Sequence, residues 1–160
     1  MTTTSLTKRG ICRTLTPSVA SAPPTTKART LHLVDIENLA GDPLVGVIEG
    51  TSQLAAFYKC AGWAPDDIVM VAANPRLACA LSFYKLVHCS VRGAHGKDGA
   101  ERKLIEHAPA SWVADRFERI VIGSGDHYFF DYARQLRRRG VEVVIIGRRG
   151  GTYEGYARAG

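Results

Sequence analysis

The strongest constraint on the fold is an alternation of short apolar runs with stretches of helical pattern. The apolar runs have the length of strands and lie at 31–34, 68–72, 87–91, 120–122 and 141–146. Between them, apolar residues at helical spacing predict helices over "GTSQLAAFYKCAG", "NPRLACALSFYKL", "DGAERKLIEHAP" and "DHYFFDYARQLRRRG". The first of these helices is predicted to begin at Thr51 or Ser52, a capping residue type. Because strand and helix alternate, the sequence predicts an α/β fold, a single Rossmann-like domain with a five-stranded parallel sheet flanked by helices on both faces.

Residues 1–29 differ from the rest of the chain in composition. They are rich in Ser, Thr and Pro and contain five cationic side chains with no Asp or Glu, so we predict a disordered basic tail. This composition fits an organelle transit peptide as well as a solubilising or nucleic-acid-contacting arm. The folded domain is expected over 30–147, with 148–160 as a C-terminal loop or tail. Since the whole chain carries a formal charge of +6 and the tail accounts for five of these charges, the domain itself is nearly neutral.

Cysteine spacing and hydropathy bear on location. The cysteines, Cys12, Cys60, Cys79 and Cys89, form no CxxC pair, so the spacing shows neither a zinc site nor a disulfide framework. The last three are predicted to be small core residues, and we expect a reducing, cytoplasmic location. No run approaches the roughly 18 consecutive apolar residues of a membrane span, so a membrane is not an expected partner.

Acidic side chains follow two of the predicted strands. Asp35 comes directly after the run at 31–34, and Asp126 follows "IVIGSG". Glu101 is expected in the first turn of a helix that itself follows a strand. Because the carboxyl ends of parallel strands share one edge, where open sheets bind ligands, the three carboxylates are expected to meet there. Crowded carboxylates raise one another's pKa, and Mg²⁺ or Mn²⁺, which prefer oxygen ligands, would relieve that repulsion, with the Asn38 amide nearby.

Each acid also has a purely structural explanation. An Asp after a strand often caps a helix or forms an Asx-turn, and that explanation stays open for Asp35 and Asp126 taken singly. Agreement among three positions at one edge favours the metal site.

The same residues resemble a known family. "VDIENL" resembles the DxxN opening of NYN domains, the metal-dependent ribonucleases of the PIN-like group. "GKDGAERKLIEHA" is similar to their central segment with an acid at the helix start, and "GSGDHYF" is similar to their SGD-x-D-F signature. The resemblance extends over about 30–147 and implies metal-binding acids at Asp35, Glu101 and Asp126, with Asn38 as a further catalytic residue. Glu101 stands where the family usually has Asp, and Tyr128 stands where the second acid of the signature is expected.

The implied activity is endoribonucleolytic hydrolysis of phosphodiester bonds in RNA, expected to be single-stranded, with Mg²⁺ or Mn²⁺ as cofactor. Lys97, Ser124, Arg148 and Arg149 are the predicted substrate-binding residues, since each lies beside a predicted acid or at the end of the last strand. The alternative function is a catalytically weak or inactive module of the same fold that binds RNA or a protein partner, because Tyr128 replaces an acid. The sequence does not specify the RNA target, the number of metal ions or the oligomeric state.

The last predicted helix carries two further patterns. "RRR" at 137–139 lies at its carboxyl end, where cations favour the helix dipole, and is predicted to serve that role rather than RNA contact. Phe129, Phe130 and Tyr132 lie at helical spacing and are predicted to pack in the core and at its rim.

Two other functions fit the same segments less well. "GSGDHY" has the first two glycines of a dinucleotide-binding G-x-G-x-x-G pattern, but Tyr128 replaces the third and Asp126 would repel a pyrophosphate. "DIE" offers the two acids of a haloacid-dehalogenase-like phosphatase, but Asn38 and Leu39 depart from the residues that should follow.

Overall fold

The computed structural model describes residues 29–83, 89–149 and 152–156, so nearly all of the predicted tail lies outside these ranges. The elements in chain order are β1 (Thr30–Asp35), α1 (Ile36–Ala40), α2 (Val47–Ala61), β2 (Ile68–Ala73), α3 (Pro75–Phe83), β3 (Cys89–Gly93), α4 (Gly99–His107), α5 (Ala110–Ala114), β4 (Arg119–Gly123), α6 (Phe129–Arg138), β5 (Glu142–Arg149) and β6 (Thr152–Tyr156). Within these ranges the structure contains no helix with both the length and the apolar character needed to span a bilayer.

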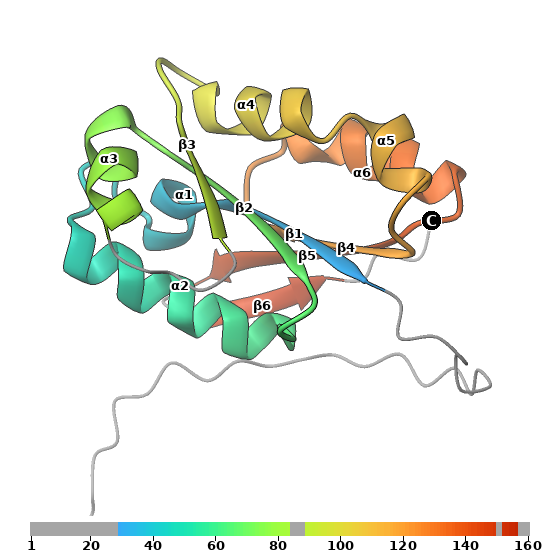
Figure 1. Ribbon diagram of the computed structural model, residues 1–160, viewed down its shortest axis with the longest axis horizontal. Coiled ribbons are helices and arrows are strands. Elements are labelled where there is room, and N and C mark those ends of the chain that lie inside the picture. The colour runs from blue at the N-terminus through green and yellow to red at the C-terminus, as the bar shows by residue number, and fades with distance from the viewer. Residues whose placement is uncertain (1–28, 84–88, 150–151, 157–160) are drawn as a thin grey trace, which may run out of the picture.

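The strands form one sheet in the order β3-β2-β1-β4-β5-β6 (Figure 1). The first five strands in this order pair in parallel, and β6 pairs with β5 in the antiparallel sense. The predicted α/β fold with a five-stranded parallel sheet is therefore confirmed. Since β1 lies between β2 and β4, the carboxyl end of β1 is at the centre of one edge of the sheet, with Asp35 opposite Ala72 and Val34 opposite Gly123.

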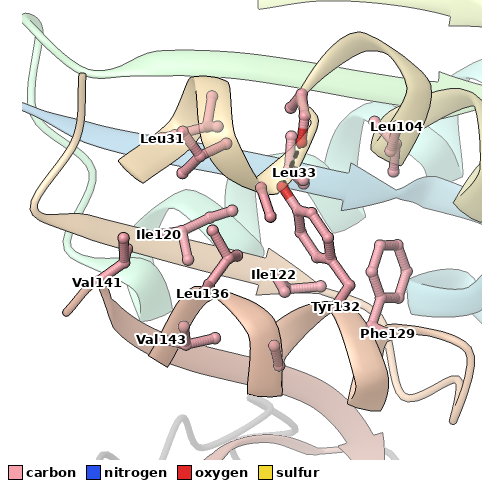
Figure 2. Packing of buried hydrophobic residues seen from close by; sticks show 14 of the residues in the cluster. Leu31, Leu33, Leu104, Ile120, Ile122, Phe129, Tyr132, Leu136, Val141 and Val143 are labelled. Atoms are coloured by element: carbon pink, nitrogen blue, oxygen red, sulfur yellow. Dashed lines mark hydrogen bonds between the residues drawn. The ribbon is translucent and has the colours of Figure 1, made fainter. Parts of the chain in front are cut away.

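Two apolar cores cover the two faces of the sheet. The face under α4, α5 and α6 buries Leu31 and Leu33 of β1 together with residues of these helices (Figure 2). The other face buries Val34 against α1, α2 and α3. Because side chains alternate along a strand and both faces are covered, β1 needs apolar residues on both sides, which explains its nearly continuous apolar run.

The first long helix begins earlier than predicted. α2 starts at Val47 after the cap residue Gly46, four residues before Thr51. The Thr51 hydroxyl does not cap the helix but donates to the carbonyl of Val47, 2.9 Å away, inside its first turn. Threonine makes this bond in helix interiors as readily as it caps helices, so its presence alone does not mark the start.

The C-terminal segment is also more ordered than predicted. β5 runs to Arg149, and Thr152 at the start of β6 pairs with it, so the prediction of a loop or tail over 148–160 is wrong for 152–156. Two glycines separate the paired residues in the sequence, a combination that favours two-residue hairpins.

Two of the cysteines depart from their predicted roles. Cys60, buried at the end of α2, is disulfide-bonded, and Cys79 is an exposed free thiol. Sequence spacing does not show which cysteines the fold brings together, which is why the disulfide was missed. The cytoplasmic location, which was inferred from cysteine spacing, stays a prediction.

Candidate metal centre

The backbone places all three predicted acids at the carboxyl edge of the sheet. Asp35 is the last residue of β1, and Glu101 lies in the first turn of α4. Asp126 lies in the loop between β4 and α6. The parallel topology therefore brings together residues that are far apart in the sequence.

Asp35 ends the strand because it also starts a helix. Its backbone is extended, and its Oδ1 accepts a hydrogen bond from the Asn38 amide nitrogen at 3.1 Å, which caps α1. The side chain is almost fully buried, at 4% exposure. The structural explanation for this acid is thus correct, but the cap requires only one carboxylate oxygen.

Asp35 lies close to a second buried acid. Asp35 and Glu101 line the same pocket, close enough for the charge of Glu101 to act on Asp35, and Glu101 is only 5% exposed. Burial raises the pKa of Asp35 to about 7, and the charges of Glu101 and Glu37 add to this effect. The backbone N–H of Asn38 opposes this rise in the pKa, since it donates a hydrogen bond to the charged form of Asp35. Ionisation of Asp35 therefore carries a free-energy cost, which a bound cation would offset.

The pair opens into an acidic pocket of about 320 Å³. The carboxylates in its lining are those of Asp35, Glu37, Asp42, Asp98 and Glu101, and the described residues that line it include no Lys, Arg or His. Such a lining attracts cations and repels free anions.

Three of these acids, Glu37, Asp42 and Asp98, were not chosen as site residues from the sequence, and the first two make hydrogen bonds nearby. Glu37 lies two residues after Asp35, and its Oε1 accepts hydrogen bonds from the Asn74 backbone nitrogen at 2.8 Å and from the Asn74 side-chain amide. Asp42 accepts from the Leu44 nitrogen at 2.8 Å. Both acids have local partners, so they line the pocket while fixing the loops around it.

Asp98 has an uncommon backbone conformation at the pocket wall. Its φ of 54° lies in the left-handed region, and it precedes α4 without a side-chain capping bond. Asp tolerates this region better than most residues, but the conformation still has an energetic cost and is common at functional sites.

Asn38 connects the end of β1 to the loop after β4. Its backbone nitrogen donates to Asp35, and its Oδ1 accepts from the Gly125 nitrogen at 2.7 Å. The loop lies close to β5 here, because a Cβ added at Gly147 would be 3.2 Å from the Cα of Gly125. Asn38 thus links α1 to the loop after β4, and the lack of side chains at Gly125 and Gly147 lets that loop lie close to β5.

Asp126 is engaged in its own loop. Its Oδ1 accepts from the Tyr128 nitrogen at 2.9 Å, which forms an Asx-turn, and lies 3.1 Å from Nδ1 of the exposed His127. Its backbone nitrogen donates to the hydroxyl of the fully buried Ser124, 3.2 Å away. Asp126 does not line the acidic pocket. Over the described residues, no group of three or more His, Cys, Asp or Glu side chains is arranged to hold a metal, so a metal site formed by Asp35, Glu101 and Asp126 stays a prediction.

The predicted substrate-binding cations have different surroundings. Nη1 of Arg148 donates to the carbonyl of Ala40 and lies over Gly41, so this guanidinium closes the end of α1 beside the pocket. Lys97 is exposed, between the pocket residues Gly96 and Asp98. Arg149 lies in β5, and its side chain is outside the described part of the chain. Phosphate binding by these residues, and by Ser124, stays a prediction.

Comparison with known proteins does not assign the chain to a family: no family model matches it, and neither a curated protein nor a solved structure does.

Proposed function

We propose that this chain is a metal-dependent endoribonuclease that uses Mg²⁺ or Mn²⁺ held by Asp35 and Glu101. The observation that carries the proposal is the proximity of these two buried carboxylates at the mouth of an acidic pocket. The sequence resemblance to NYN ribonucleases supports RNA as the substrate.

The donor set fits such an ion. The metal-ligand atoms that Asp35 and Glu101 offer are all carboxylate oxygens. Mg²⁺ is commonly bound by one or two carboxylates, with waters and substrate phosphates completing its coordination shell. Placing a double positive charge between Asp35 and Glu101 would also offset the burial and repulsion that raise the pKa of Asp35.

In this proposal each residue has a defined task. Asp35 and Glu101 hold the ion, and Asn38 orients Asp35 through its backbone nitrogen while fixing the loop after β4. When bound, the ion supplies charge neutralisation at the scissile phosphate and activation of water for in-line attack. Lys97, exposed at the pocket rim, contacts the phosphate backbone of the RNA.

A second candidate function is a module of the same fold that binds RNA without cutting it. The observation that favours it is that Asp126, whose Oδ1 is engaged by Tyr128 and His127, does not line the acidic pocket.

Cleavage of a labelled, mixed-sequence single-stranded RNA distinguishes the two. The ribonuclease proposal predicts cleavage with Mg²⁺ or Mn²⁺, none with EDTA, and a loss of at least about 100-fold in Asp35→Asn and Glu101→Gln, because charge stabilisation by the ion is worth several kcal/mol. Asp126→Asn is expected to lose less, since Asn can keep the Asx-turn. Asp131→Asn, which removes an exposed acid paired with Arg134, is the matched control and should cleave normally.

Retention of RNA without cleavage under every metal condition would favour the binding module. Cleavage that persists in EDTA, or that is unchanged in Asp35→Asn, would refute the assignment of the ion to this pair.

A further inference from the structure

The aromatic residues at the start of α6 divide into two groups. Phe129 and Tyr132 are buried in the core under α4, α5 and α6 (Figure 2). Tyr128 and Phe130 instead expose 37% and 53% of their surface. The prediction of packing in the core and at its rim is thus met in the core by Phe129 and Tyr132, while Phe130, half-exposed, lies outside the buried stripe of the helix.

The two exposed rings lie at the edge of the sheet that carries the acidic pocket. Tyr128 follows the loop after β4, and its backbone nitrogen is held by Asp126 at 2.9 Å. α4 and α6 cover the same face of the sheet, since Leu104 and Phe129 belong to the same core. Both helices begin directly after a parallel strand, so both begin at the carboxyl edge, where Glu101 of α4 faces the pocket.

Cationic side chains lie at the same edge. Lys97 precedes α4 and Arg102 lies in its first turn, and both are exposed. Exposed aromatic rings beside exposed cations are the two components of a surface that binds single-stranded nucleic acid, because the cations contact phosphates and the rings stack on bases.

We propose that Tyr128 and Phe130, which lie two residues apart at the start of α6 and so point to different sides of it, each provide one ring of a stacking platform for unpaired bases of single-stranded RNA at the edge that carries the acidic pocket. The inference rests on the proposed ribonuclease function and names the residues that contact the bases of its substrate. A ring face packs on any base that is free of a partner, whereas the bases of a duplex are already stacked on one another. It also gives a role to Tyr128, which stands where the resembling family has an acid.

The test is the affinity of the full chain for a fluorescein-labelled oligouridylate of twelve residues, measured by anisotropy in EDTA so that cleavage does not contribute. Replacement of one stacking ring is expected to weaken binding by roughly 5-fold to 100-fold, and Tyr128→Ala with Phe130→Ala more than either alone. Tyr128→Phe and Phe130→Trp keep a ring and should bind like wild type. Phe83→Ala is the matched control, because Phe83 is 83% exposed but ends α3 at the opposite edge of the sheet.

Salt dependence separates stacking from charge. Phe130→Ala should lower the affinity without changing the slope of log affinity against log salt concentration. Lys97→Ala should make that slope shallower by the amount that about one lost phosphate contact contributes. A duplex RNA should bind Phe130→Ala and wild type equally. Thermal melts of the variants establish that each is folded.

Three results would overturn the platform: no binding of the oligouridylate by wild type, equal affinity in the double variant, or an equal loss in Phe83→Ala. Concentration-dependent dimers of wild type that are absent from the double variant would also overturn it, in favour of a protein interface. Because the measurement uses neither metal nor cleavage, its failure is distinguishable from failure of the ribonuclease proposal.

Discussion

Replacement of Asp35 by Asn is expected to stabilise the fold, and to do so only above acidic pH. In the folded chain, burial and then the neighbouring acids raise the pKa of Asp35 from its ordinary 3.8 to about 7. Between these values the folded state binds more protons than the unfolded state, so the free energy of unfolding falls as pH rises. Well below pH 3.8 the residue is protonated in both states and contributes no penalty. Above pH 7 it is ionised in both states, and the penalty is fully present.

The size of this penalty follows from the difference between the two pKa values. A difference of about three pH units corresponds to about 4 kcal/mol, since each unit is worth 1.36 kcal/mol. Asn removes the buried charge and can still accept the hydrogen bond from the Asn38 nitrogen, so the cap of α1 is kept. We therefore expect Asp35→Asn to raise the free energy of unfolding by up to about 4 kcal/mol at pH 8 and by almost nothing well below pH 3.8.

The assay is urea unfolding of wild type and variant at a series of pH values in EDTA, followed by far-UV circular dichroism. Asp42→Asn is the control, because it removes an exposed charge from the same pocket and can keep the bond to the Leu44 nitrogen. If Asp35→Asn gained the same free energy of unfolding at every pH, or lost stability at pH 8, the view that the buried charge of Asp35 beside Glu101 destabilises the fold would be refuted.

Two further changes test the packing at the two ends of the parallel strands. Asp67 accepts hydrogen bonds from the backbone nitrogens of Thr30 and Ala64 and pairs with the fully buried His32 at 3.0 Å. Asp67→Ala should therefore lower the free energy of unfolding, measured by urea titration, by about 3 kcal/mol or more. A loss below about 1 kcal/mol would contradict this. Gly123→Ala places a Cβ 2.7 Å from the ring of Phe57 and should lower the free energy of unfolding by about 1–3 kcal/mol. Adding Phe57→Leu should recover most of this loss. No loss in Gly123→Ala would show that the ring moves aside freely.

Much of the fold was predictable because strands covered on both faces leave a clear signal. The apolar runs at 68–72 and 120–122 became β2 and β4 with an added residue or two. The short helices α1 and α5 were missed because five residues do not establish a helical period. β6 was missed because "TYEGY" is a short edge strand whose partner, β5, is needed to recognise it.

The candidate site was predictable in position but not in detail. Topology alone places Asp35 and Glu101 at one edge, since each follows a parallel strand or begins the helix after one. Their proximity depends on side-chain directions, which sequence spacing does not contain. For the same reason the sequence left open whether Asp126 forms an Asx-turn, as it does, and did not show how far Phe130 is exposed.

The central claim is that Asp35 and Glu101 together bind a divalent cation, and direct Mn²⁺ titration by isothermal calorimetry at pH 8 tests it most closely. Wild type is expected to bind one Mn²⁺ per chain, and both Asp35→Asn and Glu101→Gln are expected to lose that binding while remaining folded. No heat of binding in wild type, or undiminished Mn²⁺ binding in Asp35→Asn, would contradict the account.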